Sequence, residues 1–161
     1  MKPIPDGWTR ISASIYYDDA KAAIDWLCEA FGFEVRLIVE GGGQVAHSEL
    51  VYGDGMFMVG SAGKSGQLTT ARSPQSVGGA NTQGLMVYVD DVEAHHAHAV
   101  KHGAKIFREL TVSDYGDEYW SDRSYGAIDI EGHHWWFSQR ITTGNPEWSK
   151  VRNKRDQHEV K

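Results

Sequence analysis

Apolar and polar side chains alternate over residues 10–17, which predicts a half-buried strand. An amphipathic helix is predicted next, with an apolar stripe at Ala23, Ile24, Leu27 and Phe31. Asp18 or Asp19 is expected to cap the start of this helix, and Gly32 to end it. Alternation then predicts three further strands, at residues 33–40, 44–52 and 56–61.

The same order of elements returns in the second half of the chain. The pattern Tyr-x-Asp-Asp starts at Tyr16 and again at Tyr88, an offset of 72 residues (88 − 16). Each half is predicted to be a βαβββ unit, and two such units together bury sheet faces that one alone leaves open. We therefore expect an α+β fold with units over residues 8–61 and 84–140. In the second unit the predicted strands are 84–90, 104–112, 119–130 and 133–140, around a helix at 92–102.

The segments outside the two units are polar. Residues 62–83 are rich in Gly, Ser and Thr and have no apolar period, which predicts a flexible connection or a lid over a site. Residues 141–161 predict a loosely ordered C-terminal tail.

Four stretches together resemble one protein family: "AIDWLCEAFGFE", "AHSELVYGDG", "VYVDDVEAHHAHAVKHGAKI" and "DIEGHHWWF". They are similar to the vicinal oxygen chelate superfamily, which includes glyoxalase I, extradiol dioxygenases and the fosfomycin- and bleomycin-resistance proteins. The resemblance covers roughly residues 8–140. It implies that the strands form a U-shaped cup of mixed sheet with the helices outside. It also implies a homodimer with pockets at or near the subunit interface.

The metal-dependent members of this family take their ligands from the first and last strands of each unit. Carried over by position, the resemblance places Ser12, Met58, Gly84 and Trp136 where those members have His, Gln or Glu. None of these side chains suits a hard divalent cation, which prefers imidazole or carboxylate donors. The resemblance therefore implies a member without the family metal site, and we expect no metal and no other cofactor.

Strand alternation predicts which side chains point into the cup, because neighbours of a helix-facing residue face the other way. The predicted lining is aromatic and rich in thioethers, as small-molecule pockets are. Its members are Ser12, Ser14, Tyr16, Met56, Met58, Met86, Tyr88, His134 and Trp136.

His47 and Glu49 are the sharpest chemical feature of the predicted lining. If Ala46 and Leu50 face the helices, this imidazole and this carboxylate share the cup side of one strand. The pair has three interpretations: a polar contact that orients a ligand, a catalytic acid/base pair, or an atypical metal site.

Residues 115–126 combine aromatic and Arg side chains near the expected rim of the cup. Trp120, Arg123 and Tyr125 are predicted to bind a planar or anionic ligand by stacking and charge. The alternative is a strand at a sheet edge with ordinary surface aromatics.

The second predicted helix is rich in histidine. His95, His98 and His102 share one face of it, and histidine pairs on a helix can bind zinc. The alternative is packing, with His95 and His96 partly buried and the other two in solvent.

Composition narrows the classes of function. A net charge of −6 and a pI near 5.7 disfavour nucleic acid as a partner, and no apolar run is long enough for a bilayer. Cys28 is the only cysteine, and "MKPIPDGWTR" lacks the apolar core of a signal peptide, so we expect a cytoplasmic protein.

Three functions are therefore kept open. The first is binding or sequestration of a small aromatic or amphipathic ligand by a metal-free, glyoxalase- or bleomycin-resistance-like homodimer. The second is a lyase or isomerase in which His47 and Glu49 transfer protons or hold a metal. The third is an interaction module without a small ligand, which predicts a cup filled by its own side chains.

Overall fold

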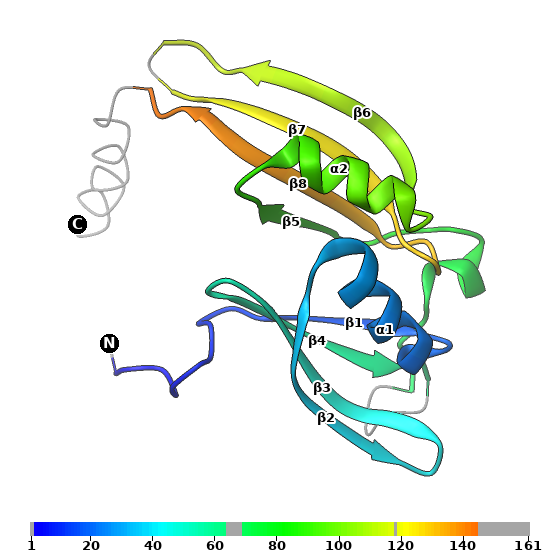
Figure 1. Ribbon diagram of the computed structural model, residues 1–161. Helices are drawn as coiled ribbons and strands as arrows, with labels where there is room; N and C mark the ends of the chain where they lie inside the picture. The colour runs from blue at the N-terminus through cyan, green and yellow to red at the C-terminus, as the bar shows by residue number, and fades with distance from the viewer. Residues whose placement is uncertain (1, 64–68, 118, 145–161) are drawn as a thin grey trace, which may run out of the picture.

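The computed structural model describes residues 2–63, 69–117 and 119–144, and these fold into two βαβββ units (Figure 1). The expectations for residues 64–68, 118 and 145–161, including most of the predicted tail, lie outside the described residues. The α+β class and the order of elements are confirmed. The elements of the first unit are β1 (Ala13–Tyr17), α1 (Ala20–Phe31), β2 (Glu34–Gly41), β3 (Gln44–Tyr52) and β4 (Gly55–Ser61).

The second unit repeats this order with β5 (Gly84–Tyr88), α2 (Val92–Lys101), β6 (Lys105–Asp114), β7 (Ser121–Ile128) and β8 (His134–Thr142). Its sheet has the strand order β5-β8-β7-β6, and the first sheet has the equivalent order β1-β4-β3-β2. In both sheets the first strand pairs in parallel with the last, and the other neighbours are antiparallel. The two sheets are therefore copies of one mixed topology.

The start of each helix follows from an aspartate in the repeated Tyr-x-Asp-Asp pattern. The Asp19 carboxylate accepts the backbone N–H of Ala22, and the Asp91 carboxylate accepts two N–H groups of the first turn of α2. A capping side chain of this kind stabilises a helix by about 1 kcal/mol. Gly32 ends α1 with φ +72°, a conformation that glycine adopts without strain.

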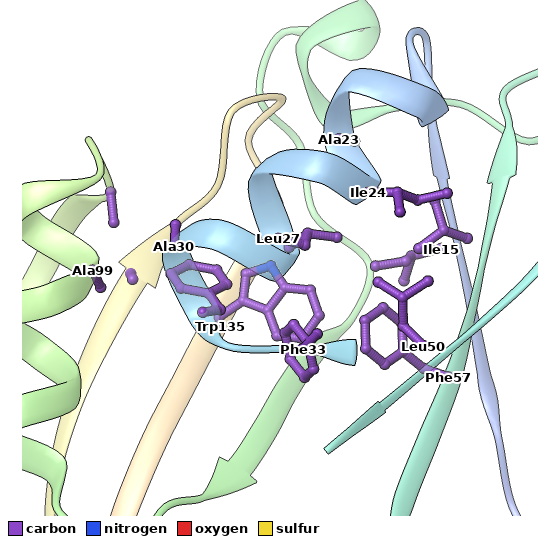
Figure 2. Close-up of a cluster of buried hydrophobic side chains, with 14 of the residues drawn as sticks. Ile15, Ala23, Ile24, Leu27, Ala30, Phe33, Leu50, Phe57, Ala99 and Trp135 are labelled. Carbon is purple, nitrogen blue, oxygen red and sulfur yellow. The ribbon is translucent and has the colours of Figure 1, made fainter. Parts of the chain in front are cut away.

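One hydrophobic core joins the two units. The Trp135 ring, which belongs to the second sheet, lies 5.3 Å from the rings of both Phe33 and Phe57 in the first unit (Figure 2). Phe31, at the end of α1, packs against Phe137 with tilted rings whose centroids lie 4.7 Å apart. The helix-bearing faces of both sheets therefore contribute to a shared interior, and the units fold against each other.

The histidines of α2 contact α1. His95 donates from Nε2 to the carbonyl of Phe31 at 3.1 Å, and His98 donates to the carbonyl of Glu29 at 2.7 Å. His102 lies 3.1 Å from the Glu29 carboxylate. His95 and His98 satisfy carbonyls at the end of α1 that the helix itself leaves unpaired. His95 and His96 are half-buried and His98 is exposed, as the packing alternative predicts, whereas His102 is half-buried instead of lying in solvent. The shared face serves helix packing.

A buried carboxylate fixes the seam between the units. Asp129, in the turn before β8, accepts hydrogen bonds from the Tyr17 hydroxyl at 2.6 Å and from Trp135 Nε1 at 2.9 Å. It also accepts the backbone N–H groups of Glu131 and His133 at 3.1 and 3.0 Å. Burial and the Asp129 charge raise the pKa of the Tyr17 phenol well above its usual value, which keeps it a donor.

The described part of the connection between the units is held at the same turn. Gln75 donates its backbone N–H to the carbonyl of Glu131, and the Asn81 amide donates to the carbonyl of Gly132. The His134 N–H donates back to Asn81 Oδ1. The Gln75 backbone N–H and the Asn81 side-chain amide thus tie residues 74–81 to the second unit, and a role as flexible connection or lid stays a prediction.

The two sheets of one chain have separate outer faces. We call the side of each sheet opposite its helix the cup face. Because the helix-bearing faces share one core, the cup faces point away from it, and Met86 on the second one is 60% exposed. Within the described ranges no strand of one sheet pairs with a strand of the other. One chain therefore carries two half-cups, with the helices at the seam between the units (Figure 1).

Candidate functional site

The cup face of the second sheet carries an aromatic cluster. The Phe107 ring stacks on His134 at 4.8 Å and meets Trp136 edge-on at 5.1 Å, and the Arg108 guanidinium lies over the same Trp at 5.4 Å. We call Phe107, His134 and Trp136 the aromatic platform. Its members come from neighbouring positions on β6 and β8, across Gly126 of β7.

The platform depends on a glycine, and a bulge brings Arg108 beside it. Alternation from the core-packed Ile106 places Phe107 on the cup face, and a β-bulge between Ile106 and Arg108 puts Arg108 on that face as well. The Phe107 ring lies directly over Gly126, where an added Cβ would come within 2.4 Å of it. Only a residue without a side chain allows this ring to lie flat on the sheet.

A polar group closes one end of the second cup face. Arg140 donates from Nε to the Asp122 carboxylate at 2.5 Å and from Nη2 to the Tyr88 hydroxyl, which donates to Asp122 at 3.0 Å. The same guanidinium lies 5.2 Å from the Tyr88 ring and 5.0 Å from the Trp120 ring. The hydrogen bond to Asp122 raises the pKa of Arg140, so this cation keeps its charge.

The first cup face carries the pair predicted from alternation. His47 Nε2 lies 3.0 Å from Glu49 Oε1, and Arg36 Nε lies 2.8 Å from Glu49 Oε2. The Glu49 side chain is only 4% exposed, whereas that of His47 is 38% exposed. The hydrogen bond from His47, followed by the Arg36 charge, lowers the pKa of Glu49 against the effect of burial. Trp8 covers the Arg36 guanidinium at 5.6 Å.

Most of the other predicted lining residues lie on the cup faces or beside them. Ser14 lies opposite Met58, with Oγ 4.0 Å from the sulfur, and Tyr16 follows on the same face of β1. Ser12 lies just before β1 and shares a 2.7 Å hydrogen bond with Thr9. On the second sheet Met86 is opposite Trp136 in the register.

Two of the predicted ligand-binding residues lie on the other side of their sheet. Tyr125 is fully buried on the helix-bearing face, where its hydroxyl and His95 share a 2.6 Å hydrogen bond. Arg123 forms an ion pair with Glu93 of α2. The expectation that they line the cup is wrong, because β7 places residues 123 and 125 on the face opposite Asp122. Ala46 is also exposed, since a bulge in β3 breaks the alternation there.

An apolar groove of about 420 Å³ lies between the edges of the two sheets. Its walls come from the ends of β1 and β4, from β5 and from aromatic side chains of the core. They include Ile11, Ala13, Phe33, Met56, Leu85 and Met86. The groove separates β1 and β5, which are the outermost strands of their sheets on this side.

Comparison with known proteins shows the family to which the chain belongs. The model of the Glyoxalase/Bleomycin resistance protein/Dioxygenase superfamily matches residues 10–137, most of the chain, and the chain belongs to this superfamily. No curated protein sequence matches it. Among solved structures, TioX from Micromonospora sp. ML1 is 30% identical, with a TM-score of 0.63 over 81% of this chain and 95% of that one.

Two further solved structures share the fold. A glyoxalase/bleomycin resistance protein/dioxygenase from Alicyclobacillus acidocaldarius is 11% identical, covers 86% of this chain and 96% of its own, and has a TM-score of 0.56. A virulence protein from Salmonella typhimurium is 14% identical, covers 83% and 98%, and has a TM-score of 0.61.

The residues at the family's metal positions do not fit a divalent cation. Cup-face positions on β1, β4, β5 and β8 offer hydroxyls, thioethers, a glycine and an indole, and His134 is the one imidazole there. In the described ranges no three His, Cys, Asp or Glu side chains come close enough to hold a metal ion. Glu49 is an unsuitable ligand because both of its oxygens already accept hydrogen bonds from cations or imidazole. Neither α1 nor α2 has the length and apolar character that crossing a bilayer requires.

Proposed function

We propose that this chain binds a small planar aromatic or amphipathic molecule, without a resident metal, in a cup completed by a second copy of the chain. The observation that carries the proposal is the aromatic platform of Phe107, His134 and Trp136, on a face that the single chain leaves uncovered. No nucleic acid and no membrane is part of the proposal, and a cytoplasmic location stays a prediction.

Stacking is the interaction that the platform offers. Aromatic rings attract one another in offset or edge-on geometries, by about 0.5–1.5 kcal/mol beyond the burial of area. Met86, opposite Trp136 in the register, adds a polarisable side chain that adapts to ligands of different outline. The Tyr88–Asp122–Arg140 group limits the length of a ligand at the other end, since its donors and acceptors already bind each other.

The free edges of two strands support the proposal that a second copy of the chain completes the cup. The outer strands β2 and β6 carry bulges, which protect sheet edges from pairing with other chains. In contrast, β1 and β5 pair with their neighbours in regular register and flank an apolar groove. A two-fold dimer that sets β1 of one copy beside β5 of the other would close the groove. It would also join a first cup face to the partner's second cup face.

Ligand binding can be tested with 2-methoxynaphthalene, a planar aromatic probe without a hydrogen-bond donor. Equilibrium dialysis should find saturable binding by the wild type and binding at least about fivefold weaker in Trp136→Ala, which loses about 1 kcal/mol of stacking. Trp26→Ala is the matched control, because it removes a half-buried indole from the seam between the helices. Equal binding by wild type and Trp136→Ala would overturn the proposal.

The dimer can be tested at Ile11, a groove-lining side chain that is 90% exposed in the single chain. Ile11→Lys should leave the fold intact and shift the sedimentation coefficient from dimer to monomer. Val100→Lys, on the exposed side of α2, should leave the wild-type value unchanged. A wild-type chain that sediments as a monomer at all concentrations would contradict this part of the proposal.

A proton-transfer enzyme is the second candidate function, and the contact between His47 and Glu49 favours it. When a carboxylate accepts a hydrogen bond from one ring nitrogen of an imidazole, the second ring nitrogen can act as a base. Exchange of the α-proton of small ketones with deuterated solvent should then be catalysed and should slow in Glu49→Gln. An unchanged exchange rate in that variant would exclude this role.

A further inference from the structure

We propose that His47 is a hydrogen-bond acceptor that selects aromatic ligands carrying a hydroxyl or N–H group. The inference rests on the proposed function and adds a specificity-determining residue to it. It begins from Glu49, which is nearly inaccessible although it lies on a cup face.

The charge state of Glu49 follows from its contacts. One carboxylate oxygen faces Arg36 at 2.8 Å and the other faces His47 at 3.0 Å. Two donors on two oxygens stabilise the ionised form, in which a carboxylate accepts hydrogen bonds and donates none.

That charge state decides the tautomer of His47. Since Glu49 only accepts, Nε2 of His47 must carry the hydrogen between them. In a neutral imidazole Nδ1 then has a free lone pair and is an acceptor. Among the described residues, no hydrogen bond to this nitrogen is present. Glu49 therefore holds the ring in one orientation and one tautomer, and it is a positioning residue.

The surroundings of His47 specify the rest of the ligand. Val39 lies opposite His47 in the sheet, and Leu37 lies opposite Glu49, so the acceptor sits beside two apolar side chains that are exposed on the same face. A group that donates one hydrogen bond from an apolar ring suits this place. A ligand carboxylate does not, because it would meet a lone pair backed by the Glu49 charge.

The test compares 2-naphthol with 2-methoxynaphthalene, which share a ring system but differ in one O–H donor. Equilibrium dialysis at pH 7 should show that the wild type binds 2-naphthol about three- to tenfold more tightly, the range expected of one net hydrogen bond. His47→Leu should reduce this ratio to within about twofold of unity, because it removes the acceptor that only 2-naphthol can use.

Three variants separate selection from a general effect on the fold. His47→Asn should keep part of the preference, because its amide oxygen can occupy the place of Nδ1. Glu49→Gln should lose the preference, since a neutral amide can donate to Nε2 and release the other tautomer. His98→Leu changes a histidine on α2, away from both cup faces, and should behave as wild type.

The outcomes are distinct. Wild-type binding of both probes with equal affinity, or an unchanged preference in His47→Leu, would overturn this inference alone. Binding of neither probe would overturn the proposed function, and this inference with it.

Discussion

Removal of the Asp129 carboxylate should destabilise the seam between the two units more than most single changes. Four buried donors point at it: the Tyr17 hydroxyl, Trp135 Nε1 and the backbone N–H groups of Glu131 and His133. Asp129→Ala leaves all four without this acceptor. An unsatisfied buried donor costs about 1–3 kcal/mol, but water entry, relaxation and the relief of a buried charge offset part of the sum. We therefore expect a loss of about 3–5 kcal/mol in the free energy of unfolding.

Urea unfolding followed by tryptophan fluorescence measures this loss, and the midpoint of thermal unfolding should fall by about 6–20 °C for a chain of this size. Asp129→Asn keeps one acceptor oxygen and should lose about 2–3 kcal/mol. The matched control is Asp25→Ala on the exposed side of α1, which should stay within about 0.5 kcal/mol of wild type. A loss below about 1 kcal/mol in Asp129→Ala would refute the view that this carboxylate joins the units.

Two further changes test the platform and the helix seam. Gly126→Ala should displace the Phe107 ring and weaken binding of 2-methoxynaphthalene several-fold. The free energy of unfolding should fall by only about 1 kcal/mol, because a partly exposed ring can move. Equilibrium dialysis measures the first effect and urea unfolding the second. Burial lowers the pKa of His95 from its ordinary 6.5. Below pH 6.5 the unfolded chain therefore binds a proton at His95 more readily than the folded chain does, and the free energy of unfolding should fall as the pH drops. His95→Gln should remove that part of the pH dependence in urea titrations, and an equal slope in both proteins would show that His95 does not cause it.

The local fold could be predicted from the sequence because it depends on short-range patterns. The repeated Tyr-x-Asp-Asp places an aspartate at each helix start, and alternation along β3 brings His47 and Glu49 to one face. The placement of one unit against the other depends on contacts over more than a hundred residues, such as that between Tyr17 and Asp129. No local period records such contacts, so the way in which the two units face each other could not be predicted from the sequence.

The missed and misplaced site residues lie on β6 and β7. Alternation alone would have found Phe107, because Ile106 packs against the core and the next side chain faces the cup. The bulge that follows brings Arg108 to the same face, which regular alternation would not have found. On β7, Asp122 points to the cup face, so Arg123 and Tyr125 point to the helix-bearing face. The cation beside Asp122 on the second cup face is therefore Arg140 of β8 and not Arg123. The Asp122 and Arg140 pair could have been suspected only after the strand register was known.

The most direct test of the account is the binding of 2-methoxynaphthalene to protein treated with a strong chelator. A metal-free cup built on Trp136 predicts saturable binding of one probe per chain in equilibrium dialysis, unchanged by the chelator and weakened at least about fivefold in Trp136→Ala. Binding that disappears with the chelator and returns with added metal, or no saturable binding at all, would contradict it.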